Sequence, residues 1–497
     1  MGWLGLLMVQ GTAVAQPVAA PVMVKAPAGV LAGSEQDGVR RFLGIPYARA
    51  PLGDLRWRPP QALPAWSGTR AAVQFGPECM QGRSGPATVP MSEDCLFLNI
   101  WVPTRHAGRR LPVLVWVHGG AFRVGTASLP LYDGAQLARQ QVVVVTLNYR
   151  LGRFGFLAHP ALTHENPDGP LGNYGLLDVL EALQWVHTNI KSFGGDPGKV
   201  TLAGQSAGGA VVYDLLSSPL AKGLFARAII ESGVFDTPTT AFAAAEQAGA
   251  AAASGWAAGA SDAAALRRLS AAQVQGEGAG LAGSFGPMVD GKVLPMDVAA
   301  AFDAGQIARM PLLIGSNSEE ARFFPAAASG LSQRLASSWP QVTAVFDGYG
   351  THRTDLVELQ LATDMLLTAP TRTAARAATA AGSPTFLYYY SYVRPSRRAQ
   401  TPGASHIDEV YALFGQMGLM PGSDPDAANA SIVTALQERW ARFARTGDPG
   451  SKLQPWPKLD LEHPQLLEFS NDGEFVRDDF ASQRLDLAAA LPRLAPR

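Results

Sequence analysis

The sequence predicts an α/β protein, with a mostly parallel sheet covered by helices on both faces. Two observations predict it. Short apolar segments typical of buried strands alternate with helical stretches. In addition, a Gly-x-Ser-x-Gly motif, Gly204–Gly208, stands between one such strand and a helix. The chain has 497 residues, of which 47% are hydrophobic and 16% are charged, which is enough for a large core. We find no internal repeat or clear linker, so we expect one domain with helical insertions.

The strands are predicted from short apolar runs rich in β-branched residues, and the helices from apolar spacing between them. Because near-continuous apolar strands are typical of a sheet buried on both faces, these runs favour a parallel arrangement. The Ala-rich stretch 241–260 contains Glu246 and Gln247 and is expected to be a helix of a soluble protein. The predicted strands are Val113–Val117, Val142–Leu147, Val200–Ala203, Ile229–Ile230, Pro311–Gly315 and Phe386–Val393, and the clearest helices are Leu176–Ile190 and Ala210–Leu216.

The Gly-x-Ser-x-Gly motif has the surroundings of a nucleophile elbow. A tight turn between strand and helix holds the serine in a strained conformation, so the residues two before and two after it must be small. Such a turn exposes the hydroxyl of Ser206 above the edge of the sheet, at a helix N-terminus. The alternative is an ordinary Gly-rich turn in a chain with 52 glycines.

A serine nucleophile needs a base and a group that orients the base. Of the eight histidines, His406 lies in a loop after the Phe386 strand, where the order Ser, acid, His places the base. His118 opens a Gly-rich loop suited to donating backbone N–H groups to an oxyanion, and its side chain is expected to be structural. The acid is expected in the loop 315–320, which contains Glu319 and Glu320, and at least one of these glutamates is expected to be solvated.

Charge and hydropathy exclude several function classes. The 40 basic and 41 acidic residues leave a net charge of −1, and no basic block stands out, so no nucleic acid partner is expected. Nothing approaches an 18-residue apolar run, so no membrane span is expected.

Residues 1–15 are interpreted as a signal peptide, since Trp3–Val9 is apolar and Ala13–Ala15 fits a cleavage site. A disordered tail is the alternative, because this segment contains no Lys or Arg. Export would make the protein secreted or periplasmic. Cys79 and Cys95 are the only cysteines; they are either free and buried or, if the protein is exported, joined in a disulfide.

Several motifs together resemble the type-B carboxylesterase family, the carboxylesterase/cholinesterase branch of the α/β-hydrolases. The resemblance extends over about residues 28–490, which implies a single α/β-hydrolase domain. The motifs that carry it are Phe42–Ala48, Glu93–Ile100, His118–Phe122, Asn148–Arg150, Phe193–Pro197, the elbow, and Trp440–Pro449.

The resemblance implies a serine hydrolase that cleaves carboxylic esters (EC 3.1.1.-) without a cofactor or a metal ion. It assigns Ser206 as nucleophile, Glu320 as the acid and His406 as the base. It also implies an oxyanion hole formed by Gly120, Ala121 and Ala207, and a disulfide between Cys79 and Cys95. Two structural ion pairs are implied as well, Arg56 with Glu93 and Arg150 with Asp178. A small-molecule ester is the expected partner, and the oligomeric state is left open.

The chain departs from the family pattern at several positions. Ala321 and Ile407 stand where glycines are frequent, and Gln205 replaces the glutamate of cholinesterases. The short Cys79–Cys95 loop contains no tryptophan, so a choline ester specialist is not expected. Arg123, expected above the oxyanion hole, is either an ion-paired or snorkelling side chain or, with Gln205, a candidate substrate-binding residue.

Two alternatives share this fold. One is an interfacial lipase that acts on long acyl chains, which depends on loops that the sequence does not place. The other is a non-catalytic adhesion protein, which the presence of Ser206, Glu320 and His406 disfavours.

Overall fold

The computed structural model describes residues 21–82, 89–105, 108–235, 239–256, 262–276, 285–347, 353–420 and 426–492. The segment interpreted as a signal peptide, residues 1–15, lies outside them. Within the described residues, no helix is both long enough and apolar enough to cross a bilayer.

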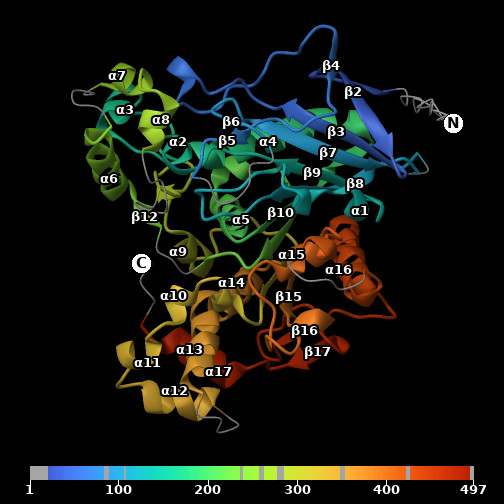
Figure 1. Cartoon of the computed structure of the whole chain (residues 1–497), viewed down its shortest axis with the longest axis vertical. Coiled ribbons are helices and arrows are strands. Elements are labelled where there is room, and N and C mark those ends of the chain that lie inside the picture. Colours follow the sequence, from blue (N-terminus) through green and yellow to red (C-terminus); the bar gives the residue numbers. More distant parts are fainter. Residues whose placement is uncertain are drawn as a thin grey trace, which may run out of the picture.

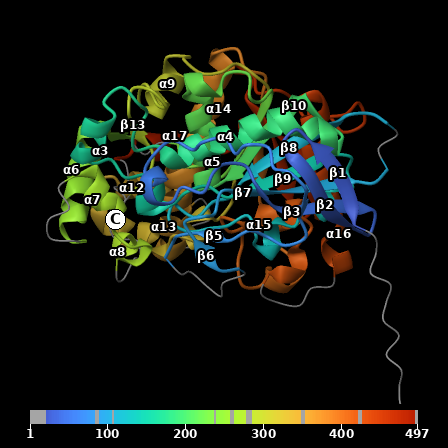
Figure 2. The ribbon, with the colours of Figure 1, turned by 90° about the horizontal axis from the view of Figure 1, so that it is seen from above.

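One large sheet runs through the middle of the molecule (Figures 1 and 2). Its strands lie in the order β1, β2, β3, β7, β9, β8, β10, β11, β14, β15, β16 and β17, and β4 also pairs with β2. Neighbours are parallel from β9 to β16. They are antiparallel from β1 through β3 and β7 to β9, and between β16 and β17. The sheet is therefore parallel at its centre, as predicted, and antiparallel at its two ends.

The bounds of its strands are β1 (Val22–Ala26), β2 (Gly29–Gln36), β3 (Val39–Pro46), β4 (Thr69–Ala71), β7 (Phe97–Pro103), β8 (Leu111–Val117), β9 (Val143–Leu147), β10 (Gly195–Gln205), β11 (Arg227–Glu231), β14 (Leu312–Asn317), β15 (Thr385–Tyr390), β16 (Gln465–Ser470) and β17 (Gly473–Asp478). Short pairs outside it are β5 (Glu78–Cys79) with β6 (Met91–Ser92), and β12 (Thr240–Ala241) with β13 (Met288–Val289).

The helices are α1 (Ala135–Ala138), α2 (Gly152–Gly155), α3 (Pro160–Glu165), α4 (Tyr174–Asn189), α5 (Ala207–Ser217), α6 (Phe242–Ser254), α7 (Ala263–Arg267), α8 (Ala271–Gln275), α9 (Val298–Asp303), α10 (Pro325–Ala328), α11 (Leu331–Arg334), α12 (Trp339–Phe346), α13 (Thr354–Thr363), α14 (Ala369–Ala380), α15 (Asp408–Leu413), α16 (Asp426–Thr446) and α17 (Ser482–Ala490).

Both faces of the parallel strands are buried, because successive side chains of a strand point to opposite faces. In β8, Val113 and Val115 belong to one hydrophobic core, whereas Leu114 and Trp116 belong to the other. Helices α4, α5 and α14 contribute to the first core, and α1, α15 and α16 contribute to the second. Two covered faces explain why these strands are near-continuous apolar runs.

Helical insertions surround this sheet. Helices α10 to α13 pack with α17 around a separate small core (lower part of Figure 1), and α6, α7 and α8 lie together at the upper left. Within the Ala-rich stretch, residues Phe242–Ser254 form the helix α6, as predicted.

Each predicted strand coincides with an observed one, with differences at the ends. β10 begins at Gly195, before a register shift against β8 between Gly195 and Val200. β15 ends at Tyr390 rather than Val393, whose N–H donates to Asn471 Oδ1 in a loop. The strands that end the sheet on both sides were not predicted.

Cys79 and Cys95 form a disulfide, as the resemblance implied. The bond ties β5 to the segment that leads into β7. Closing a loop with a sequence separation of 16 stabilises the fold by about 3 kcal/mol in the chain-entropy model.

Candidate active site

Ser206 lies in a sharp turn between β10 and α5. Its backbone has φ 58° and ψ −124°, a strained conformation for a residue with a side chain. A Cβ at Gly204 would lie 2.4 Å from the carbonyl oxygen of Gly208, and one at Gly208 would lie 2.0 Å from that of Val117. Both positions must therefore be glycine, so the requirement for small residues in the motif has a direct steric cause.

The loop after β8 packs against this turn. A Cβ added to Gly119 would lie 3.0 Å from Ser206 Cβ, so the two backbones are in close contact. Gly120 and Ala121 have positive φ values of 114° and 54°, and the carbonyl of Gly120 accepts hydrogen bonds from the N–H groups of Arg123 and Val124. This folding leaves the N–H groups of Gly120 and Ala121 without a partner among the described residues. Ala207 begins α5, where N–H groups also have no partner within the helix.

His118 is structural, as its place in the loop indicated. Its Nδ1 lies 2.8 Å from the carbonyl oxygen of Gly119, and its ring stacks on Tyr149 with centroids 4.7 Å apart. Burial lowers the pKa of His118 to about 4, so the imidazole is neutral near pH 7. The side chain therefore shapes the loop.

The structure brings His406 and Glu320 together across 86 residues of sequence. His406 Nδ1 lies 2.6 Å from Glu320 Oε2, and both side chains are buried. The other oxygen, Oε1, accepts hydrogen bonds from Ser232 Oγ at 2.6 Å and from the N–H of Asn317 at 2.7 Å. His406 Nε2 has no hydrogen-bond partner among the described residues. The carboxylate is thus held in one orientation, and the far nitrogen of the imidazole is available to accept a proton.

The His406 loop is also attached to the elbow through Gln205. The Gln205 side chain is only 2% exposed, and its Nε2 donates to the carbonyl oxygen of His406 at 2.6 Å. This buried contact replaces the interpretation of Gln205 as a substrate-binding residue, because its amide is already engaged in holding the neighbouring loop. Asn317 Nδ2 makes a second link to this loop, by donating to the carbonyl of Ser405 at 2.7 Å.

The expectation that one of Glu319 and Glu320 is solvated was wrong. Glu319 is 5% exposed, and its Oε2 accepts hydrogen bonds from Thr401 Oγ1 and from Arg322 Nε, both at 2.6 Å. Its own N–H donates to the carbonyl of Ala404. The cost of burying this carboxylate is therefore offset by the Arg322 guanidinium and the Thr401 hydroxyl. Through these contacts Glu319 joins the two loops that carry Glu320 and His406.

Two further buried carboxyl groups, Glu231 and Glu409, border this network and were missed by sequence reasoning. Glu231 Oε1 accepts from Trp440 Nε1 at 2.7 Å, and Glu409 accepts from Asn317 Nδ2. Burial raises the pKa of both carboxyl groups, and repulsion from Glu231 and Glu320 adds to the rise for Glu409. Neither position has a sequence pattern that predicts a buried carboxyl group, because Glu231 simply ends a strand and Glu409 follows His406 by three residues.

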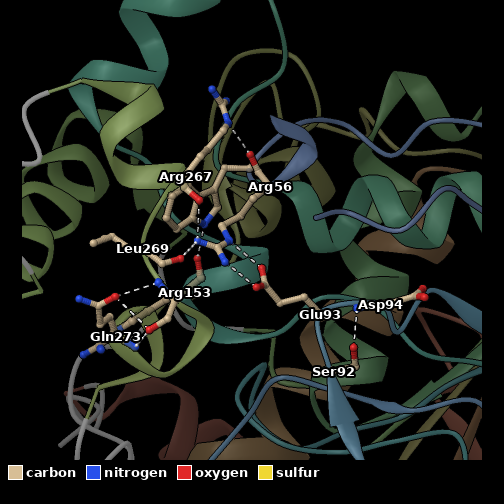
Figure 3. A network of polar contacts seen from close by, with 10 residues as sticks. Arg56, Ser92, Glu93, Asp94, Arg153, Arg267, Leu269 and Gln273 are labelled. Atoms are coloured by element: carbon tan, nitrogen blue, oxygen red, sulfur yellow. Dashed lines mark hydrogen bonds and ion pairs between the residues drawn. The ribbon is translucent and has the colours of Figure 1, made fainter. Parts of the chain in front are cut away.

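Arg123 follows the oxyanion loop and is half-buried, and burial lowers the pKa of its guanidinium. The two predicted ion pairs are present. Arg56 binds Glu93 through Nη2 and Nε at 2.5 and 2.7 Å, and Arg150 binds Asp178 at 2.7 and 2.8 Å. Figure 3 shows the Arg56 guanidinium between the Glu93 carboxylate and backbone carbonyls of Arg267 and Leu269. These pairs anchor loops, and neither touches Ser206 or His406 in the contacts described.

No group of three or more His, Cys, Asp or Glu side chains in the described ranges is arranged to hold a metal ion.

Known proteins of similar sequence identify the family of this chain. The model of the carboxylesterase family matches residues 20–344 and 347–488. The chain belongs to the carboxylesterase family. It is 37% identical to a fumonisin B1 esterase of Sphingopyxis macrogoltabida, over 90% of this chain and 87% of the relative. It is 34% identical to the para-nitrobenzyl esterase of Bacillus subtilis strain 168, over 92% and 97%.

Solved structures of carboxylesterases also match. A carboxylesterase of Geobacillus stearothermophilus superposes with a TM-score of 0.81 and 32% identity, covering 94% of this chain and 99% of the other. A para-nitrobenzyl esterase gives a TM-score of 0.79 with the same coverage. The protein is thus a carboxylic ester hydrolase with the α/β-hydrolase fold.

Proposed function

We propose that this carboxylesterase hydrolyses esters through an acyl-enzyme on Ser206, with His406 as general base and acid and Glu320 as the orienting carboxylate. The observation that carries the proposal is the His406–Glu320 contact, which leaves His406 Nε2 without a hydrogen-bond partner in the described chain. Gln205, the neighbour of Ser206, also binds the carbonyl of His406. A base oriented by a buried acid is the arrangement that activates a serine hydroxyl.

The reaction proceeds in two halves. Ser206 Oγ attacks the ester carbonyl carbon while His406 Nε2 takes the hydroxyl proton. The alcohol then leaves with that proton, and the acyl group remains on Ser206. A water molecule, deprotonated by His406, attacks the acyl carbon, and the proton returns to Ser206 as the carboxylic acid is released. Glu320 stabilises the imidazolium that forms in each half.

The N–H groups of Gly120, Ala121 and Ala207 form the oxyanion hole in this proposal. Those of Gly120 and Ala121 have no protein partner in the described chain, and Ala207 adds the positive end of α5. Donors fixed in advance stabilise the charge of a tetrahedral intermediate, and each is typically worth about 10²–10³-fold in rate.

Covalent labelling tests the nucleophile. A fluorophosphonate should add one phosphonyl group to Ser206 of the native protein with loss of fluoride, and digestion with mass spectrometry locates it. Ser206→Ala should remain unlabelled under the same conditions. Labelling of that variant to the same extent would contradict the assignment.

We further propose that the enzyme favours anionic esters through Arg123. This residue follows the proposed oxyanion donors, and a guanidinium matches the shape of a carboxylate. The printed names of the relatives supply two candidates for a substrate panel, fumonisin B1 and para-nitrobenzyl esters. A chain-length series of neutral esters in the same panel separates a short-ester enzyme from an interfacial lipase.

The Arg123→Ala variant should lose activity selectively on charged substrates. The matched pair is p-nitrophenyl hydrogen adipate and p-nitrophenyl hexanoate, whose acyl chains are equally long. Loss of a charge-assisted hydrogen bond should lower kcat/KM about tenfold or more on the adipate ester and leave the hexanoate unchanged. Equal losses on both esters would instead indicate a structural arginine.

A further inference from the structure

Arg153 occupies a second cationic position close to the oxyanion loop. It is the second residue of α2, and the N–H of Gly152 before it donates to the carbonyl of Phe122 at 2.6 Å. Phe156, which ends the helix, packs edge to face on Phe122 with ring centroids 5.3 Å apart. The backbone that carries Arg153 is therefore fixed against the loop that also carries Gly120 and Ala121.

The Arg153 guanidinium lies close to two aromatic rings. Its central carbon is 5.3 Å from the ring centroid of Trp256 and 5.7 Å from that of Phe285. Trp256 in turn stacks on Trp57, with centroids 6.3 Å apart and planes 17° apart. Trp57 is held by its Nε1, which donates to the carbonyl of Arg153 at 2.8 Å. These two cation–π contacts restrict the position of the guanidinium.

Among the residues that the structure describes, only one nitrogen of this guanidinium has a hydrogen-bond partner. Nη1 donates to the carbonyls of Val274 and Gln275, at 3.0 and 2.8 Å. Within the described residues, no carboxylate pairs with Arg153, and Nε and Nη2 have no hydrogen-bond partner. Arg56 and Arg267 differ from Arg153 in this respect, because each of them forms an ion pair with a glutamate. Burial also lowers the pKa of Arg153, as expected for a partly desolvated cation without a counter-charge.

The unengaged edge has the geometry for a carboxylate. The N–H groups of Nε and Nη2 are parallel and can bind both oxygens of one carboxylate. The segment that carries Phe285 also lies next to the oxyanion loop, because a Cβ on the next residue, Gly286, would lie 3.7 Å from the ring of Phe122. Phe285, which contacts the guanidinium, thus stands one residue from a position beside Phe122.

We propose that Arg153, Trp256 and Phe285 form a subsite for a substrate carboxylate that is remote from the scissile ester. The subsite rests on the proposed function of Ser206 and its neighbours, and it narrows the substrate class to esters that carry a free carboxylate beyond an apolar spacer. Trp256 and Phe285 contact the spacer, and Arg153 binds the charge.

Kinetics on esters of increasing spacer length test the subsite. For p-nitrophenyl monoesters of a series of linear dicarboxylic acids, Arg153→Gln should raise KM about tenfold at the best spacer length, with kcat unchanged. The corresponding neutral esters should show no change, and Arg153→Lys should restore part of the affinity because it keeps the charge without the fork. Arg49→Gln, which removes an exposed arginine bonded to Gln61, controls for the change in net charge.

A purely structural role predicts a different result. If Arg153 serves only to hold the end of α8 through Val274 and Gln275, Arg153→Gln should lower the melting temperature and reduce activity on neutral and carboxylated esters alike. That outcome would overturn the subsite.

Direct binding separates this proposal from the assignment of the nucleophile. Calorimetric titration with the dianion of the best dicarboxylic acid requires no turnover. The native protein and Ser206→Ala should bind it equally, and Arg153→Gln should bind it about tenfold more weakly. Equal binding by Arg153→Gln would overturn the subsite even if Ser206 proves to be the nucleophile.

Discussion

Replacement of Ser206 by alanine should lower kcat about 10⁶-fold, because removing the nucleophile of a serine triad costs about as much as removing the whole triad. The loss should fall on kcat rather than KM, since the rest of the site remains to bind the ester. Alanine fits the turn, although it shares the strain of φ 58°. Stopped-flow measurement with p-nitrophenyl esters should also show that the initial burst of product disappears.

A matched control is Ser217→Ala at the far end of the same helix, α5. Ser217 Oγ donates to the carbonyl of Asp214 at the helix end, where it has no part in the site. This variant should keep full activity. Retention of more than a thousandth of the native kcat by Ser206→Ala would show that another nucleophile carries the reaction.

Replacement of Glu320 by glutamine should lower kcat about 10⁴-fold, because the amide favours the wrong tautomer of His406. Oε1 accepts from the N–H of Asn317, a backbone donor that cannot turn away, and from Ser232 Oγ. The amide oxygen of glutamine must therefore occupy this position, which directs the NH₂ group toward His406 Nδ1. Nδ1 then accepts a hydrogen bond, so Nε2 carries the proton and cannot take another from Ser206.

Glu319→Gln is the control for the adjacent carboxylate. It weakens the contacts with Arg322 and Thr401 but leaves the His406–Glu320 contact in place. We expect less than a tenfold change in kcat, together with a lower melting temperature. A larger loss in Glu319→Gln than in Glu320→Gln would exchange the roles of the two residues.

Much of the central sheet was predictable because its strands are buried on both faces and are therefore apolar throughout. The outer strands were not predictable, because they are only partly buried and lack a continuous apolar run. In β17, Phe475 and Val476 are 39% and 40% exposed and stand among charged residues, so the strand depends on its pairing with β16. The elbow was predictable because its pattern, with Gly204 and Gly208 around Ser206 between a strand and a helix, is local in the sequence. Part of its steric requirement is tertiary, since a Cβ at Gly208 would meet the carbonyl oxygen of Val117 in β8.

The residues that support the candidate site were not predictable in the same way. Glu319 and Glu320 are adjacent in sequence and share a residue type, yet one contacts Arg322 and the other His406. Only the packing of the loop decides which carboxylate faces which partner. The same holds for Gln205, whose amide binds a carbonyl 201 residues away.

The sequence by itself predicted the elbow at Ser206, because a serine with glycines two residues before and after it, between a strand and a helix, is a pattern of only a few residues. The tertiary structure alone decided which side chains from distant segments surround that serine. The parallel strands β8, β10, β11 and β14 bring His118, Ser206, Ser232 and Glu320 to one edge of the sheet, and the loop after β15 adds His406. Within the described part of the chain, it also left the Nε and Nη2 edge of Arg153 without a hydrogen-bond partner. Hydrogen bonds between such distant segments depend on where the chain returns in space, which local sequence patterns do not encode.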